Sequence, residues 1–213
     1  MIYEERSISL QRGTVDAFVS DFDRTVKPAL EAIGGEALCT LSAVIGDPAE
    51  EVMQITRFPD YQAWEQAQNA YVASPMAMVQ SESVRLLKPV ASRPSATIAA
   101  DDLRPFYGHR RFFISPDDLD EFVHCSEEGI WPRIEAQGAR ILGLWTTVAA
   151  TTPMEIVLLT GYHGPAHWEQ TRAYQDPPEG FDPALWERSR RMHAKRSLLP
   201  IRTWVRLMRR VGA

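Results

Sequence analysis

The chain has 213 residues, of which 45% are hydrophobic and 24% are charged, and its formal net charge is −5 at pH 7. This apolar fraction suffices for a packed core, so the composition excludes an intrinsically disordered or collagen-like chain. No apolar run approaches the roughly 18 residues of a membrane-spanning helix, and the first ten residues lack the apolar segment of a secretory signal. We therefore expect a cytoplasmic globular protein with no membrane partner.

Basic residues concentrate at the end of the chain. From Arg188 onward there are nine Lys and Arg residues and no acid, which leaves 14 basic residues against 28 acidic ones in the remainder. Such a segment can bind nucleic acid or another anion, or it can be a solvated face that neutralises the acidic body. Most nucleic-acid binders are basic overall, whereas this chain is acidic. The solvated face is therefore favoured, and nucleic acid is not an expected partner.

The sequence contains an internal repeat. With an offset of 104, residues 6–66 align without a gap with residues 110–170, and 15 of these 61 positions are identical. Average residue usage gives only about four identities by chance. Farther along the offset becomes 121, where Val84–Val90 aligns with Val205–Val211. The chain is therefore a duplicated unit of about ninety residues, and the second copy has gained 17 residues within Ala173–Leu199.

Hydrophobic periodicity assigns strands and helices to the first copy. Alternating apolar residues predict strands, and apolar residues spaced three and four apart predict helices. Gly34 ends the first predicted helix, and Asp60 is placed to cap the second. The expected elements are strand Ile2–Gln11, helix Gly13–Ile33, strands Glu36–Ile45 and Glu51–Phe58, helix Asp60–Tyr71 and strand Gln80–Pro89.

The second copy repeats this order and adds a helix. A linker rich in Ser, Ala, Pro and Asp precedes it, so the expected organisation is a first unit at 1–90, a linker at 91–103 and a second unit at 104–213 with an insertion around 173–199. Its expected elements are strand Tyr107–Ile114, helix Pro116–Gln137, strands Arg140–Ala149 and Glu155–Tyr162, a helix from about Pro165, the inserted helix Ala184–Lys195 and strand Ile201–Val211.

The order β-α-β-β-α-β is the ferredoxin-like arrangement of an α+β protein. Apolar residues occupy both faces of the central strands, as in the run Ile156–Leu159. A sheet that is apolar on both faces must bury both. We therefore expect the two tandem units to pack sheet against sheet as an intramolecular dimeric α/β barrel, either as a monomer or as a homodimer of such barrels.

Three segments of the first copy form a recognisable pattern: the opening Met1–Arg6, the run Val52–Asp60 and the last strand Ser83–Pro89. Together they resemble the NIPSNAP family of the dimeric α/β-barrel superfamily. The sequence departs from the family pattern at Gln54 and Thr56, and the second copy has Gly108 opposite Glu4 and Gly161 opposite Arg57. The resemblance implies the fold and a relation to small-molecule monooxygenases, cyclases, isomerases and some haem binders, which use a cavity between a sheet and its helices.

Charged residues on the first strand suggest catalytic chemistry. Glu4 and Arg6 lie two residues apart on one face, where a proton-transfer group and a guanidinium could meet a substrate carbonyl or carboxylate. Arg6 recurs as Arg110, and Arg85 recurs as Arg206. The alternative for all of them is a structural salt bridge. We predict Glu4, Arg6 and His163 as catalytic residues, and Arg110, Trp145, Arg85 and Arg206 as substrate-binding residues.

The histidines and cysteines give weaker signals. His163 and His167 are four residues apart, but Gly164 and Pro165 indicate that the helix begins after His163, and no third ligand is evident. We predict no metal site. His124 and His193 are further candidates for a general base, whereas His109 is expected at the surface. Cys39 and Cys125 are expected to be buried apolar residues.

The sequence leaves three functions open. The first is a small-molecule enzyme, of cyclase, isomerase or cofactor-independent oxygenase type, that acts on an organic carbonyl or carboxylate. The second is a non-catalytic binding or interaction scaffold, in which side chains fill both cavities. The third is a haem protein with His163 or His193 as axial ligand. No GxSxG, Walker or GxGxxG motif occurs, so no cofactor is expected.

Overall fold

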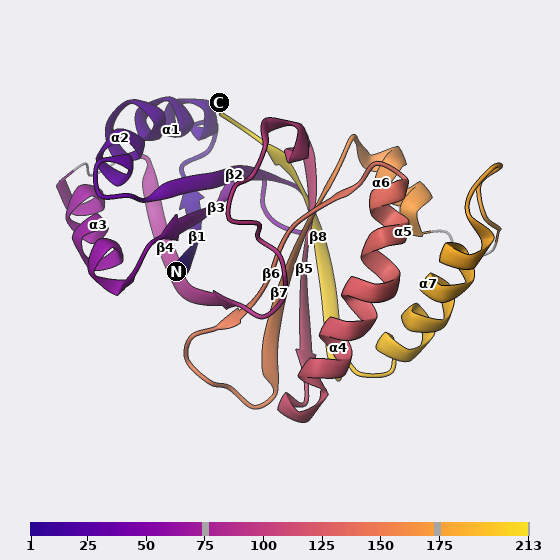
Figure 1. Cartoon of the computed structure of the whole chain (residues 1–213). Helices are drawn as coiled ribbons and strands as arrows, with labels where there is room; N and C mark the ends of the chain where they lie inside the picture. The colour runs from indigo at the N-terminus through magenta and orange to yellow at the C-terminus, as the bar shows by residue number, and fades with distance from the viewer. Residues whose placement is uncertain (74–76, 173–175, 213) are drawn as a thin grey trace. The chain divides into compact units, whose positions relative to one another are not determined.

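The computed structural model describes residues 1–73, 77–172 and 176–212. The chain divides into two compact units (Figure 1), one of Met1–Lys88 together with the chain end from Met208, and one of Pro89–Leu207. The last strand therefore contributes its first residues to the second unit and its final residues to the first. Residues 173–175, where the predicted insertion begins, lie outside the described residues.

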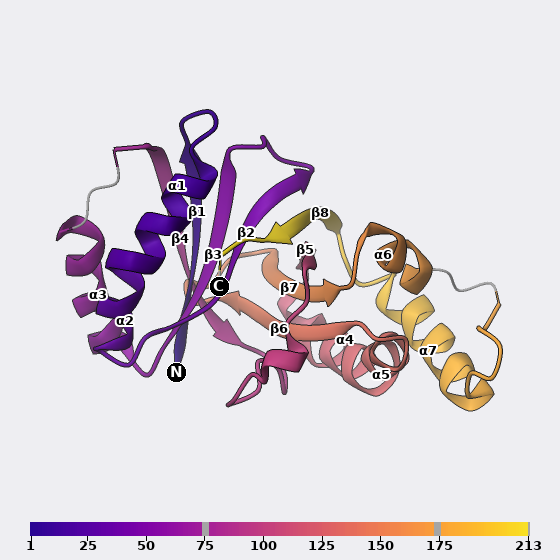
Figure 2. The same ribbon diagram turned by 90° about the horizontal axis from the view of Figure 1, so that it is seen from above.

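The first unit is a four-stranded antiparallel sheet with helices on one face (Figure 2). Its strand order is β4-β1-β3-β2, which is the ferredoxin-like order. Asp60 accepts a hydrogen bond from the Ala63 amide at 2.9 Å and caps α3, as predicted. The elements are β1 (Ile2–Leu10), α1 (Val15–Asp21), the π-helical turn η1 (Phe22–Val26), α2 (Lys27–Glu31), β2 (Glu36–Ile45), β3 (Glu51–Phe58), α3 (Tyr61–Ala73) and β4 (Val79–Pro89).

The second unit has the same architecture with strand order β8-β5-β7-β6. Short helical turns η2 (Ala100–Asp102) and η3 (Pro116–Asp118) precede its first strand and first helix. The elements are β5 (Phe106–Ile114), α4 (Leu119–Cys125), the π-helical turn η4 (Ser126–Ile130), α5 (Trp131–Ala136), β6 (Arg140–Thr147), β7 (Met154–Tyr162), α6 (Pro165–Arg172), α7 (Pro183–Arg196) and β8 (Arg202–Arg210).

The two units reproduce the sequence repeat in three dimensions. β1 pairs with β3 in the register Glu4↔Thr56, and β5 pairs with β7 in the register Gly108↔Thr160, so both partners shift by the same offset of 104. The strand irregularity at Ala37/Cys39 recurs at Ile141/Gly143. Residues 104 apart therefore occupy equivalent positions in the two sheets.

The first helix of each unit differs from the prediction in one respect. Each was expected to be a continuous α-helix, but a π-helical turn interrupts it. In both turns a hydroxyl donates to the carbonyl four residues earlier, Thr25 to Asp21 at 2.6 Å and Ser126 to Phe122 at 2.7 Å. Such a bond competes with the backbone ladder of a helix, which gives a local reason for the wider turn.

The inserted helix α7 packs on the helical layer of the second unit (Figure 1). A Cβ atom on Gly129 of η4 would lie 2.5 Å from the Met192 side chain, so the absence of a side chain there permits a close approach. Arg196 donates to the Ser126 hydroxyl at 2.8 Å, and Lys195 pairs with Glu121 at 2.6 Å. These contacts fix the end of α7 against α4 and η4.

Candidate functional site

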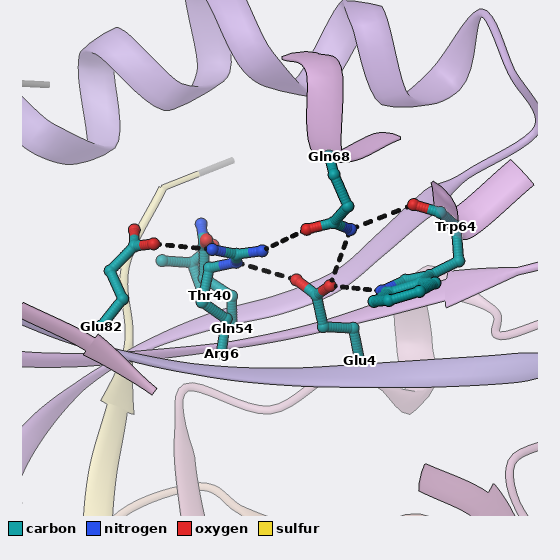
Figure 3. A network of polar contacts seen from close by, with 7 residues as sticks. All are labelled: Glu4, Arg6, Thr40, Gln54, Trp64, Gln68 and Glu82. Carbon is teal, nitrogen blue, oxygen red and sulfur yellow. Dashed lines mark hydrogen bonds and ion pairs between the residues drawn. The ribbon is translucent and has the colours of Figure 1, made fainter. Parts of the chain in front are cut away.

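In the first unit, Glu4 and Arg6 lie at the centre of a polar network between the sheet and α3 (Figure 3). Glu4 is 1% exposed and Arg6 4%. The Glu4 carboxylate accepts from Arg6 Nε at 2.8 Å, from Trp64 Nε1 at 2.7 Å and from Gln68 Nε2 at 3.2 Å. Three donors therefore surround one buried carboxylate.

Arg6 uses the rest of its guanidinium within the same network. It donates to Glu82 at 2.7 Å and to Gln68 at 3.1 Å, and its Cζ atom lies 3.8 Å from the centre of the Tyr71 ring. Burial opposes the charge of Arg6, but the attraction of Glu4, with smaller contributions from Tyr71 and Glu82, raises its pKa overall. This geometry favours the structural salt bridge for the pair, and a catalytic role for Glu4 and Arg6 stays a prediction.

The second unit keeps the arginine of this network and replaces both of its acidic partners. Gly108 stands at the position of Glu4, and Thr203, by the offset of 121, stands at the position of Glu82. Arg110 stands at the position of Arg6, and Arg172 at that of Gln68. A cavity of about 270 Å³ occupies this place between the sheet and the helices.

The cavity is lined by cationic and aromatic side chains. Among the described residues, its lining contains four arginines and one histidine but no Asp or Glu. It draws on β5, β7, α5, α6, α7 and β8, so the inserted helix supplies part of the wall. The charged and indole-bearing lining residues are Arg110, Trp131, Arg133, Trp168, Arg172, His193 and Arg196.

Arg133 and Arg196 are positioned by hydrogen bonds and ring contacts within the second unit. Arg133 is 0% exposed and donates to Ser189 Oγ at 3.1 Å, to Gln137 at 3.2 Å and to the Thr171 carbonyl at 2.7 Å. The Arg196 guanidinium lies between two phenyl rings, with its Cζ atom 5.4 Å from the Phe112 centroid and 5.1 Å from the Phe122 centroid. These contacts orient two of the four arginines of a lining that contains no Asp or Glu among the described residues, a composition that favours an anion in the cavity.

His193 of α7 shares this environment. Burial, together with the charges of Arg196, Arg133 and Arg110, lowers the pKa of His193 below its ordinary value of 6.5. Its imidazole is therefore neutral near pH 7 and able to accept a proton. Of the histidines proposed from the sequence as a general base, His193 is the one in the lining of this cavity.

The other predicted site residues lie elsewhere. His163 is exposed at the turn before α6, where its backbone amide donates to His167 Nδ1 at 3.0 Å. Trp145 is fully buried and neighbours Leu144, a member of the core beneath the helices, so it points to the opposite face of β6. Arg85 lies 3.5 Å from Glu5. The predicted set therefore does not converge on one site, although Arg110 lines the cavity.

One expectation about β5 was wrong. His109 is 0% exposed instead of lying at the surface, and its Nδ1 atom accepts a hydrogen bond from Arg206 Nε at 3.0 Å. Both faces of β5 are buried, so the face opposite Arg110 is not solvated. Arg206 and His109 are the repeat equivalents of Arg85 and Glu5, and both pairs are in contact.

The cysteines are buried, as predicted. Burial raises the pKa of Cys39 to about 12, and burial together with Glu121 raises the pKa of Cys125 to about 11. Both side chains are therefore thiols near neutral pH and are poor nucleophiles.

Among the described residues, no cluster of three or more His, Cys, Asp or Glu side chains is suited to a metal ion. Within the same residues, no helix is both long enough and apolar enough to span a membrane.

These features define a protein of mixed α/β, ferredoxin-like class. Residues 3–98 match the NIPSNAP family model, so the chain contains a NIPSNAP domain. The match confirms the resemblance carried by the first, third and last strands of the first copy. Comparison with curated protein sequences finds no match.

Three solved structures share the fold over nearly the whole chain. A candidate monooxygenase from Lactobacillus acidophilus NCFM is 12% identical with a TM-score of 0.68, and the alignment covers 98% of this chain and 93% of the other. A candidate monooxygenase from Fusobacterium nucleatum subsp. nucleatum ATCC 25586 is 9% identical with a TM-score of 0.60, covering 99% and 92%. An anthrone oxidase-like protein is 9% identical with a TM-score of 0.58, covering 99% and 91%.

The first prediction concerns the network of the first unit. Arg6→Ala is expected to lower the free energy of unfolding by about 3–5 kcal/mol, because it leaves the buried Glu4 carboxylate without its cation. The control Arg24→Ala removes an exposed arginine paired with Asp21 and should cost under about 1 kcal/mol. Urea unfolding measures both. Equal losses for the two variants would contradict the structural role of the pair.

The second prediction concerns His193. The unfolded chain protonates this residue at a higher pH than the folded protein does, so its depressed pKa destabilises the fold as the pH falls from about 6.5 toward the folded-state value. His193→Gln should therefore lose less thermal stability than the parent between about pH 7 and pH 5.5. His124→Gln, at an exposed position, is the control and should follow the parent. A His193→Gln profile that coincides with the parent would disprove the assignment.

Proposed function

We propose that the chain is a small-molecule enzyme whose active site is the cavity of the second unit, and that it forms an enolate from a carbonyl substrate. The observation that carries the proposal is a neutral histidine in a cavity lined by four arginines. His193 would take a proton from a carbon that the carbonyl acidifies, either the neighbouring carbon or, as in anthrone, the CH₂ group conjugated with the carbonyl through the aromatic rings. The arginines would stabilise the negative charge that develops on the enolate oxygen.

The names of the structural neighbours favour oxygenation among the reactions open to an enolate. Two are candidate monooxygenases and one is anthrone oxidase-like. In the proposed reaction the enolate reduces molecular oxygen. For anthrone, the CH₂ group becomes a carbonyl, one oxygen atom of O₂ enters the product, and the other leaves as water. The electrons come from the substrate, so no other reductant is required.

The scaffold and haem alternatives fit the second unit less well. A scaffold predicts side chains in both cavities, which describes the polar network of the first unit but not the 270 Å³ space of the second. That volume is close to the lower limit of about 300 Å³ for ligand pockets, and a porphyrin requires more. Of the two axial ligands considered from the sequence, His193 lines this cavity and His163 is exposed at a turn away from it, so the small volume is what argues against haem.

We further propose that the two sheets close into one barrel within a single chain. Buried residues on both faces of β3 and β7 support this, since each sheet needs a cover on the side away from its helices. β4 is an edge strand in the sheet of the first unit. Slow hydrogen exchange at the β4 amides that point away from β1 is the expected result, and rapid exchange there would contradict closure.

The activity prediction uses anthrone as the probe. Oxygen uptake and anthraquinone formation should be equal in amount, and Arg110→Ala should lower kcat/KM by about tenfold or more because it removes positive charge from the cavity in which the enolate forms. Arg24→Ala changes an exposed side chain of η1 in the first unit, so it is the control and should keep the parent rate. Equal rates for Arg110→Ala and the control would contradict the proposed site.

A further inference from the structure

The first unit contains a carboxylate in the place where the second unit has a cavity. The Glu4 carboxylate is held by a guanidinium, an indole N–H and a side-chain amide, from Arg6, Trp64 and Gln68 (Figure 3). All three donors come from the sheet face and helix that have direct equivalents in the second unit. The network therefore serves as an internal template for carboxylate binding.

The second unit keeps or strengthens each donor and removes the carboxylate. Arg110 and Trp168 repeat the guanidinium and the indole, and Arg172 replaces the neutral Gln68 with a cation. A Cβ atom on Gly108 would lie 3.6 Å from Trp168 Nε1, so the indole nitrogen faces the position from which a Glu4-like side chain would extend. The Arg172 Cζ atom lies 4.6 Å from the centre of the Trp168 ring. The Trp168 indole therefore lies beside the position of the Glu4 side chain in the first unit, with Arg172 against its ring, and Arg110 lines the same cavity.

A second observation points to a ligand in the same cavity. Trp131 lines it and is 4% exposed, and its indole Nε1 has no hydrogen-bond partner among the described residues. A buried polar atom without a partner costs stability. The buried Arg133 guanidinium adds positive charge to the same lining. An anionic organic ligand would meet the positive charge of this lining.

We propose that the cavity binds a carboxylate group of the substrate in the niche beside Gly108, with Arg110, Trp168 and Arg172 in the roles that Arg6, Trp64 and Gln68 have around Glu4. The inference deepens the proposed function, on which it rests for the identity of the ligand as a substrate. The substrate class is then an aromatic or other apolar carbonyl compound that bears a carboxylate. The carboxylate anchors the molecule, and His193 lies in the wall of the same cavity.

The first arm of the test restores the missing carboxylate. Gly108→Glu should place an acid among the donors, whereas Gly108→Gln fills the same volume without the charge. A Cβ atom here would lie 3.3 Å from the Tyr162 ring, so both variants carry the same small packing cost. We expect the melting temperature of Gly108→Glu to exceed that of Gly108→Gln by about 2 °C or more. A Glu variant no more stable than the Gln variant would overturn the proposal.

The second arm begins with the unaltered protein, so its main comparison does not depend on whether the variants fold. Calorimetric titration with benzoate should show binding at one site per chain, and benzamide, the neutral analogue of the same shape, should bind at least about tenfold more weakly. Gly108→Glu should abolish benzoate binding. Gly164→Glu adds an acid at an open position outside the lining and should bind benzoate as the parent does.

Binding and turnover separate the two proposals. Equal affinity for benzoate and benzamide, or no binding of either, would overturn the carboxylate niche. A protein that binds benzoate as described but converts no carbonyl substrate would leave the niche standing and refute the enzymatic function. Oxidation of anthrone by a protein that binds benzoate no more tightly than benzamide would support the enzymatic function and refute the carboxylate niche.

Discussion

The buried ion pair of Glu4 and Arg6 is the interaction on which the account of this protein depends. A charged side chain between a sheet and its helices is stable only when another group compensates it. In the first unit that compensation comes entirely from within the protein, through Glu4, Glu82 and Gln68. In the second unit the two acids are absent at the equivalent positions. The duplicated unit therefore has one interior that contains its own carboxylate and one interior with a cavity lined by four arginines.

The inserted helix changes the second unit further. α7 covers the helical layer of that unit and brings His193 and Arg196 to the cavity. The contact of Gly129 with Met192 and the hydrogen bond of Arg196 to Ser126 set its position. The same arginines that favour an anion also lower the pKa of His193. The positive charge of these arginines therefore favours the binding of an anion and also keeps the His193 imidazole neutral.

The fold could largely be predicted from the sequence because its signals are local. Strand alternation, helical spacing, the cap at Asp60 and the repeat itself gave the order of elements and the insertion. The candidate site could be predicted only in part. The replacement of Glu4 by Gly108 was visible in the alignment of the two copies, and Arg110 was identified as a binding residue. Sequence distance gave no indication that Arg133, Arg172, His193 and Arg196 meet, since they come from three different helices.

The expectation that His109 lies at the surface failed because strand parity tells which residues share a face but not what covers that face. His109 is buried and bonded to Arg206, and Trp145 is buried on the face away from Leu144. A comparison of equivalent residue pairs would have helped to predict the contact of His109. The contact of Glu5 with Arg85 in the first unit recurs as the contact of His109 with Arg206 in the second.

The two copies have diverged at one place, where the first unit holds the Glu4 carboxylate and the second unit has a cavity lined by arginines. Diffraction from crystals soaked in 4-bromobenzoate, with the bromine located by its anomalous signal, tests this most directly. The account predicts one bromine position per chain, in the second unit, with the carboxylate beside Gly108 and Arg110 and with the Glu4 network of the first unit unchanged. Bromine in the first unit, or in both units equally, would contradict it.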